Sequence, residues 1–555
     1  MPPPMKEDFP PDGMIWPLVP NSRKEGDRST MSANKRAFCA ATRAVDCPLS
    51  LEMLNEKKWR KTYTRHAYNH VVTCLESKDA AVACAQAGLD WMHHNFDFVK
   101  DGEEMSLAQA MTNVDDSFFT GFVRGTKPRP TSTVLEVPYK GEILTGKRLH
   151  DQVDKWVSHG TIEPSAGEAI KDVSLNDSWR DLSDKYFVLL GAGSAMGPLK
   201  FLLDLGANII AIDLGRQHIW ERLLSLAENS SGTMTFPIRV GRPQSGLKTM
   251  EELCEAAGAN LLTQTPDILN WVKSICPDGP VVVGSYAYLD GELHVRLSLA
   301  MDAIVNGLIE SRPDIIPAYL CTPTDIHVIP QAAHEAAQQQ YSSLGFVNML
   351  CRLTINGLGS LAVNAKKPVV AKDGSTFYLV DGLVKKQGPN YALAKRLQHW
   401  RAVVSRHTHG CRVSSNIAPS TATASVVSNK LFALAYGGMK FFKPMEVFQQ
   451  ETSNAVMGAL LLRDVCDPAT PSNPSLPLKN PLQLFSYGSF HGGVWRMAYT
   501  MNSIGTPAVL AYLLQYLGFL VLILLSVVCL GFVGIKIAKG ENVVEDMQSL
   551  FKGEL

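Results

Sequence analysis

Apolar positions along this chain change their spacing several times, and each spacing predicts a different kind of element. Over 51–111 they recur every three or four positions among many alanines, which is typical of packed amphipathic helices. A second helical pattern covers about 147–181, after a proline-punctuated connection at 126–142. Residues 1–30 are rich in proline and charge and are expected to be disordered. The pattern therefore predicts a helical N-terminal region over 31–180.

The pattern changes at 186–216, where short apolar runs flank a glycine-rich turn and a helical stretch. The run 187–190 leads into the turn, and a second strand-like run, 209–212, ends in an aspartate. This unit is typical of dinucleotide binding, because glycines let the backbone approach a pyrophosphate and the acid accepts ribose hydroxyls. A glycine-rich turn of another α/β protein is the alternative. The expected cofactor contacts here are Gly191, Gly193, Ser194, Ala195, Met196, Gly197 and Asp213.

An uncharged run near the C-terminus, residues 508–535, predicts a single transmembrane helix. About 20 apolar residues suffice to cross a hydrocarbon core of roughly 30 Å, so a buried soluble helix is the weaker alternative. The N-terminus has no apolar run behind a basic start, which argues against a secretory signal. We therefore expect a single-pass C-terminal anchor in an unspecified membrane. The main domain would lie on the cytoplasmic side, and a short tail, 536–555, would follow the helix.

Composition narrows the classes of partner. The 53 basic and 53 acidic residues give zero formal charge, so no global field favours nucleic acid. The length of 555 residues suggests two to four structural units. None of the 11 cysteines forms a C-x-x-C pair, and His93 and His94 would point to different faces of a helix. We expect reduced thiols and no metal site.

A family resemblance emerges about 200 residues after the glycine-rich turn. Residues 375–423 combine a strand-like run, a Y-x-x-x-K pair, an amphipathic helix, a strand and the turn VSSNIAPSTAT. Their order resembles the short-chain dehydrogenase/reductase (SDR) superfamily, as does the loop at 190–197, while 279–287 takes the place of the family's "NNAG" strand. The resemblance covers about 185–500, with an insertion near 289–330. It implies an NAD(P)-binding, Rossmann-like doubly wound parallel sheet between the helical N-terminal region and the transmembrane helix.

The resemblance also implies roles for individual residues. In the SDR reaction a tyrosine exchanges a proton with the substrate oxygen while nicotinamide gives or takes a hydride. Tyr391 would be that acid/base, and Lys395 would favour its phenolate and hold the nicotinamide ribose. Asn348, in VNMLCRL, would be the structural and proton-relay asparagine, and Thr423 would contact the cofactor.

A second Y-x-x-x-K pair exists at Tyr436 and Lys440, because the motif is short enough to arise by chance. The sequence AYGGMK places two glycines between these residues, which disfavours the helix needed to bring both onto one face. Tyr391 and Lys395 are separated by Ala-Leu-Ala and are therefore the preferred pair.

The predicted site departs from the family at the catalytic serine. Alignment of TFYLVDG with the family's strand places Asp381 in the serine position, ten residues before Tyr391. An ionised carboxylate about 4 Å from the phenol would oppose the phenolate by about 4 kcal/mol at an effective dielectric of 20. Three alternatives stay open: a protonated Asp381 donates as serine would, it turns away, or the site no longer reduces carbonyls.

Together these patterns predict a membrane-anchored NAD(P)-dependent oxidoreductase that interconverts an alcohol and a carbonyl. The anchor motivates a lipophilic substrate. Asp213 favours NAD because a carboxylate repels a 2′-phosphate, and Arg216 weakens that preference. The alternative is a non-catalytic nucleotide-binding scaffold or sensor at a membrane. The state of assembly, including a homo-oligomer, stays open.

Overall fold

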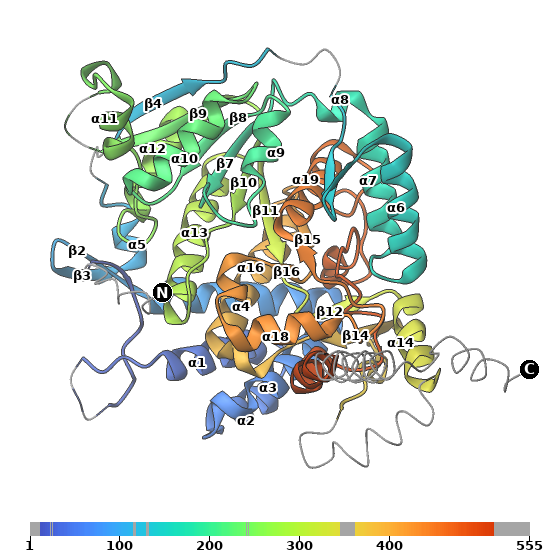
Figure 1. Ribbon diagram of the computed structural model, residues 1–555. Coiled ribbons are helices and arrows are strands. Elements are labelled where there is room, and N and C mark those ends of the chain that lie inside the picture. The colour runs from blue at the N-terminus through green and yellow to red at the C-terminus, as the bar shows by residue number, and fades with distance from the viewer. Residues whose placement is uncertain are drawn as a thin grey trace, which may run out of the picture.

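A seven-stranded mixed sheet forms the centre of the computed structural model (Figure 1). The structure describes residues 12–22, 24, 26–114, 118–128, 133–239, 241, 243–343 and 361–515. Six neighbouring strands are parallel, and the seventh, β4, pairs antiparallel with β9 at one edge. In spatial order the strands are β15 (Ser414–Ile417), β11 (Ile315–Cys321), β10 (Val281–Ser285), β7 (Tyr186–Leu190), β8 (Asn208–Ile212), β9 (Thr233–Arg239) and β4 (Phe118–Arg124).

The order of the parallel strands reverses direction at β7. From β7 the chain moves outward through β8 and β9, then returns to the other side of β7 and continues through β10, β11 and β15. In open parallel sheets such a switch point leaves a crevice outside the carboxyl ends of the strands, where ligands bind. Leu190 is in register with Ile212 on one side and Ser285 on the other, so three strands end at one level.

Alternate residues of each central strand enter two different hydrophobic cores, which is why these strands are apolar throughout. Val188 and Leu190 face one core, and Phe187 and Leu189 face the other. The first core contains helices α12 (Thr265–Ile275), α13 (Glu292–Ser311) and α16 (Gly388–His407). The second contains α9 (Leu199–Asp204), α10 (Gln217–Glu228), α11 (Met250–Ala256) and α19 (Gln450–Cys466).

The N-terminal helices are divided between the two sides of the sheet. In Figure 1 the first group lies below α16, and the second lies beside α19. The first group is α1 (Thr30–Arg43), α2 (Cys47–Asn55), α3 (Trp59–Cys74) and α4 (Lys78–Asn95). The second group is α6 (Gly146–His159), α7 (Pro164–Leu175) and α8 (Asp177–Arg180).

Short elements extend these two groups. They are the small sheet β1 (Gly13–Ile15), β2 (Asp97–Lys100) and β3 (Glu103–Ser106), the helix α5 (Leu107–Ala110), and the hairpin β5 (Val137–Tyr139) and β6 (Glu142–Leu144). With β4 in the central sheet, the region predicted as helical over 31–180 also contributes strands.

A triad of a buried ion pair and a half-buried histidine fastens α4 to the central unit. Arg401 of α16 donates two hydrogen bonds to Asp302 of α13, at 2.8 and 2.9 Å. His93 of α4 lies 2.6 Å from the same carboxylate, from its Nε2 atom. Burial alone would raise the pKa of Asp302, but the charge and hydrogen bonds of Arg401 lower it to about 2. His93 thus contacts a buried carboxylate across the boundary between α4 and α13.

A second unit interrupts the chain between β11 and α16. Its three strands follow the order β12, β14, β13, separate from the central sheet. The predicted insertion near 289–330 does not coincide with this unit, because most of that range forms α13 and β11 of the central unit. The elements of this interruption are β12 (Ile326–Ile329), α14 (Gln331–Ser343), β13 (Val369–Val370), β14 (Thr376–Asp381) and η2 (Lys385–Gln387).

The predicted fold class needs two corrections. The sheet is mixed, because β4 joins its edge in the antiparallel direction. In the part of the chain that the structure describes, no helix is long and apolar enough to cross a membrane. The predicted span at 508–535 begins within a helix that runs from 501 to 515, where Ile504 and Ala508 are fully buried, and 516–535 lie outside the described residues. At the start of that run Ala508 is therefore packed against the protein, whereas Leu510, Leu513 and Leu514 are exposed.

We predict that Asp302→Asn lowers the free energy of unfolding by about 3–5 kcal/mol, because it leaves the buried Arg401 without its ionic partner. The measure is urea denaturation, with Asp90→Asn on the exposed face of α4 as the matched control. Since folding depresses the pKa of Asp302, the stabilisation is present above about pH 4 and declines as the pH falls toward 2. Equal stability of both variants near neutral pH would contradict the triad's role.

Candidate functional site

One cavity of about 530 Å³ lies at the switch point of the sheet. Residues that follow the carboxyl ends of five parallel strands line it, together with helix α16. The lining residues central to the argument are Gly191, Asp213, Ser285, Thr322, Tyr391 and Ser420. Segments separated by more than 200 positions in the sequence therefore meet in one place.

The glycine-rich loop is held by hydrogen bonds to both neighbouring strands. The amides of Gly191 and Ala192 both donate to the carbonyl of Ile212, while those of Tyr286 and Ala287 donate to the carbonyl of Leu190. This close approach excludes any side chain at Gly191. Its φ is +89°, and an added Cβ would lie 2.5 Å from the Cα of Ala287.

The other predicted loop residues are placed individually. Gly193, Ser194, Ala195 and Met196 line the same cavity as Gly191. Gly197 instead lines an adjoining cavity of about 1030 Å³ on the other side of the loop, where a Cβ would meet its nearest neighbour at 3.3 Å. The side-chain amide of Asn454 on α19 donates to the carbonyl of Ala195 at 3.0 Å and fixes the far side of the loop.

Asp213 lies at the end of β8, with its carboxylate turned toward the loop. Oδ2 accepts the amide of Gly193 at 2.7 Å, and Oδ1 accepts the amide of Leu214 at 2.8 Å. Burial raises the pKa of Asp213, and the two amides together with Arg222 and Arg216 oppose this rise. Arg222 also donates to the carbonyl of Gly193 at 2.8 Å. The carboxylate and the loop thus form one bonded unit.

Tyr391 and Lys395 lie one turn apart on α16, and both line the cavity. Lys395 Nζ donates to the carbonyl of Leu320 at 3.4 Å and to Oε1 of Gln398 at 3.3 Å. Burial lowers the pKa of Lys395, opposed by Cys321 and Asp325. The pair predicted from Y-x-x-x-K is therefore brought to the cavity on one helical face.

Two threonines directly after β11 stand beside the tyrosine, and the sequence analysis missed both. The hydroxyls of Thr322 and Thr324 lie 2.8 Å apart. Burial raises the pKa of Tyr391, and hydrogen bonding with the two threonines counteracts this. A signal was present in the sequence, because TPT follows the apolar run 315–321. The assignment of 289–330 to an insertion concealed that run's place in the central sheet.

Asp381 does not occupy the position beside Tyr391, and its assignment to the serine slot is corrected. It ends β14, opposite Ile326 of β12, and so belongs to the separate three-stranded sheet. Its carboxylate lies 3.8 Å from Lys366 Nζ in another cavity, of about 410 Å³. The backbone at this strand end lies beside Asp325, but the Asp381 side chain lines the other cavity and not the one at the switch point.

The buried carboxylate that acts on Tyr391 is Asp325. It contributes to raising the pKa of Tyr391, after burial itself. Asp325 accepts a hydrogen bond from Arg396 at 2.6 Å and another from its neighbouring amide, that of Ile326, at 2.7 Å. Arg396 follows Lys395 on α16, so the carboxylate is compensated from the same helix that carries the pair.

The remaining predicted residues differ in their placement. Thr423 lines the cavity after β15, whereas Asn348 lies outside the described residues. Tyr436 lines the cavity from α18 (Lys430–Met439), which continues through the two glycines of AYGGMK. The expectation that these glycines break the helix is therefore wrong.

Close packing explains the two glycines of α18. A Cβ on Gly438 would lie 1.8 Å from the carbonyl oxygen of Ala508, and one on Gly437 would meet the ring of Tyr512 at 2.4 Å. The helix at 501–515 thus approaches α18 so closely that only glycine fits at the contact. Each glycine makes the helix about 1 kcal/mol less stable than an alanine would, and the close packing of the two helices offsets this cost.

Histidine 294 completes the wall behind the tyrosine. Its ring stacks on that of Tyr391, with centroids 5.7 Å apart and planes inclined by 27°. It is buried, neither ring nitrogen has a hydrogen-bond partner, and burial lowers its pKa well below the usual value. His294 therefore stays neutral beside Tyr391.

Comparisons of the chain with protein-family models, with curated proteins and with solved structures find no match.

We predict that Gly191→Ala destabilises the fold far more than Gly374→Ala. Both positions have a positive φ, which costs an alanine about 1–2 kcal/mol, but the space around Gly374 is open. At Gly191 the clash with Ala287 should add about 1–3 kcal/mol. Urea denaturation of both variants measures the difference, and equal losses would mean that the loop is not clamped between the strands.

Proposed function

We propose that the cavity binds NAD(P), with NAD favoured, and that the protein is an oxidoreductase interconverting an alcohol and a carbonyl. One observation carries the proposal. The switch point of the sheet brings the glycine-rich loop, Asp213 and the Tyr391–Lys395 pair into a single cavity. A dinucleotide needs a close backbone approach at one end and a proton-transferring group at the other.

The lining of the cavity supports this choice of cofactor. Gly193 has no side chain, and a Cβ there would meet Asp213 and Arg222, so the glycine lets the loop lie directly against both groups. The buried hydroxyls of Ser285 and Ser420 line the cavity without a hydrogen-bond partner. Buried hydroxyls usually have hydrogen-bond partners, so atoms of a bound ligand are the natural partners for these two. Asp213 would take the adenosine ribose hydroxyls, and its negative charge disfavours a 2′-phosphate.

The chemistry divides between the cofactor and the protein. When bound, nicotinamide would supply or accept the hydride at the substrate carbon. Tyr391 would give a proton to the carbonyl oxygen in reduction, or take it from the hydroxyl in oxidation. Because burial raises its pKa, the phenol is protonated near neutral pH and suited to donation. Thr322 and Thr324 would hold the phenol oxygen in place, as the missing serine would in the family that the sequence resembles.

In the proposed enzyme, Lys395 would favour the phenolate form of Tyr391 and hold the nicotinamide ribose. Its ammonium group donates hydrogen bonds to Leu320 and Gln398, so protein groups already occupy it. This observation favours a second candidate, a nucleotide-binding scaffold or sensor without turnover. In the enzyme, Lys395 would exchange those bonds for cofactor and tyrosine when the dinucleotide binds.

We predict that Tyr391→Phe leaves dinucleotide affinity within about twofold and lowers turnover by 10²–10⁴-fold, the usual range for lost acid/base catalysis. Lys395→Ala should reduce both. Affinity is measured by fluorescence titration with NADH and NADPH, and turnover by nicotinamide absorbance across a panel of alcohols and ketones. Tyr68→Phe, in a different cavity, is the matched control. Binding without turnover in the parent would favour the scaffold, and absence of binding would overturn both candidates.

We further predict that the Thr322→Val/Thr324→Val double variant loses turnover at least about 10-fold, because the phenol loses its hydrogen-bond partners.

Asp381→Ser should leave the pH profile of turnover unchanged, since that carboxylate lies in a separate cavity beside Lys366. The turnover of the threonine double variant and of Asp381→Ser is measured by steady-state kinetics from mildly acidic to alkaline pH. A shifted optimum in Asp381→Ser, with full activity in the threonine variant, would reverse the assignment of the hydroxyl donor.

A further inference from the structure

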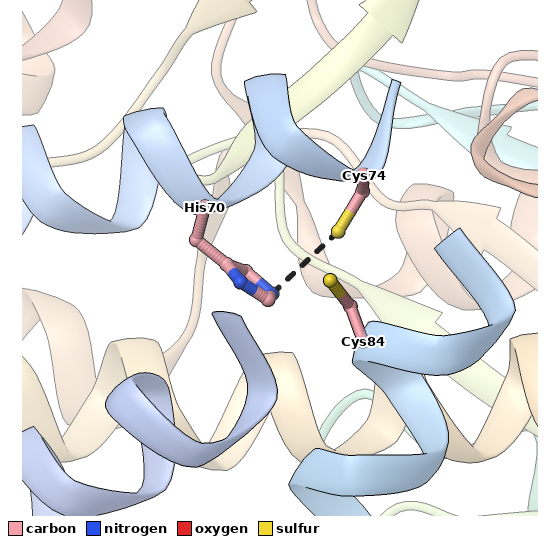
Figure 2. A group of neighbouring side chains, drawn as sticks. All are labelled: His70, Cys74 and Cys84. Carbon is pink, nitrogen blue, oxygen red and sulfur yellow. Dashed lines mark hydrogen bonds between the residues drawn. The ribbon is translucent and has the colours of Figure 1, made fainter. Parts of the chain in front are cut away.

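Three potential metal ligands meet in the core between α3 and α4, far in sequence from the proposed cofactor site. His70 and Cys74 lie one turn apart on α3, and Cys84 faces them from α4 (Figure 2). Their exposed fractions are 1%, 4% and 0%. Each offers one ligand atom, and these atoms all lie within 4.8 Å of one another.

The spacing of the ligand atoms suits a single small cation. With metal–sulfur and metal–nitrogen distances of about 2.3 and 2.0 Å, neighbouring ligand atoms of a metal centre lie roughly 3.5–4 Å apart. The sulfur of Cys74 is 3.8 Å from Nε2 of His70. An ion could therefore be bound with side-chain shifts of at most about 1 Å.

The histidine already has the orientation and tautomer that a metal requires. The indole N–H of Trp400 donates to His70 Nε2, so this nitrogen carries a lone pair and the proton resides on Nδ1. Nδ1 then donates to Oγ1 of Thr42 at 3.0 Å. Ligating histidines usually have their second nitrogen fixed in this manner. A metal would displace the Trp400 bond, which at 3.3 Å is long and weak, and the Cys74 sulfur–Nε2 hydrogen bond at 3.8 Å.

We propose that His70, Cys74 and Cys84 bind one thiophilic d¹⁰ cation, Zn²⁺ or Cu⁺. Two thiolates and a neutral imidazole would give a neutral centre with Zn²⁺, which suits a buried position. The two soft thiolates would also suit Cu⁺, because thiolate sites select it. The two ions share this chemistry, and separate loading experiments distinguish them.

The site lies among four helices, of which α16 is distant in the sequence from the other three. α3 and α4 supply the ligands, α1 supplies Thr42, and α16 supplies Trp400, five residues after Lys395. A metal there would fasten α3 to α4, beside the helix that carries the Tyr391–Lys395 pair. The role is structural, and its test does not depend on oxidoreductase activity.

The experiment uses the full chain, purified without oxygen and loaded with Zn²⁺ alone or Cu⁺ alone against a chromophoric chelator. We expect one equivalent per chain in at least one arm, with two sulfur ligands and one nitrogen ligand by X-ray absorption. Cys74→Ala and Cys84→Ala should each weaken binding at least about 100-fold. Thr42→Val, which keeps all three ligands, should weaken it about 10-fold. Cys39→Ala removes a buried thiol outside the cluster and should have no effect.

The outcomes separate the proposal from its competitors. Absence of stoichiometric metal in both arms would overturn it and leave the residues as ordinary core packing. Recovery of a Cys74–Cys84 disulfide on mild oxidation, with no metal bound under reducing conditions, would also overturn it. If the cysteine variants fail to fold, Thr42→Val and the absorption spectrum of the parent still decide the question, because neither alters a ligand.

Discussion

The fold depends on the hydrogen bonding between β7 and its two parallel neighbours at the point where all three strands end. Backbone amides from the following segments return to the carbonyls of Leu190 and Ile212, which leaves no room for a side chain at Gly191. Because parallel strands present their carboxyl ends together, this arrangement fixes where every later loop of the sheet emerges. The cavity, Asp213 and the end of β11 take their positions from it.

Buried arginine–carboxylate pairs attach the surrounding elements to that sheet. Asp302 with Arg401 connects α4, α13 and α16, and Asp325 with Arg396 connects the end of β11 to α16. Desolvation of each ion costs several kcal/mol, which is offset only while the hydrogen-bond geometry is kept. Helix α16 carries both arginines and the Tyr391–Lys395 pair. The same pairs that hold this helix therefore hold the candidate acid/base in position.

The surroundings of Tyr391 govern its proton affinity through opposing influences. Burial raises its pKa, as does the charge of Asp325, and the hydroxyls of Thr322 and Thr324 lower it. His294 adds a ring surface without charge, because burial keeps it neutral. A protonated phenol in a largely apolar wall is suited to giving a proton to an oxygen atom.

The sequence alone determined the local units of the fold. Apolar runs at 187–190 and 209–212, the glycine-rich loop between them and the i, i+4 spacing of Tyr391 and Lys395 are short-range features, and the structure forms each as a strand, loop or helix. Their physical basis is backbone preference and periodicity, which neighbouring residues supply. Such patterns do not reveal which distant segments will pair.

Tertiary structure decided the rest, because strand pairing and side-chain burial join residues far apart in the chain. Thr322, and not Asp381, stands beside Tyr391, since a separate sheet takes up the intervening residues. The cluster at His70 and Cys74 needs Cys84 from the next helix. The sequence has no C-x-x-C motif that would have indicated this cluster. In both cases the decisive neighbour lies beyond the reach of local periodicity, and only the packing of elements against each other brings it near.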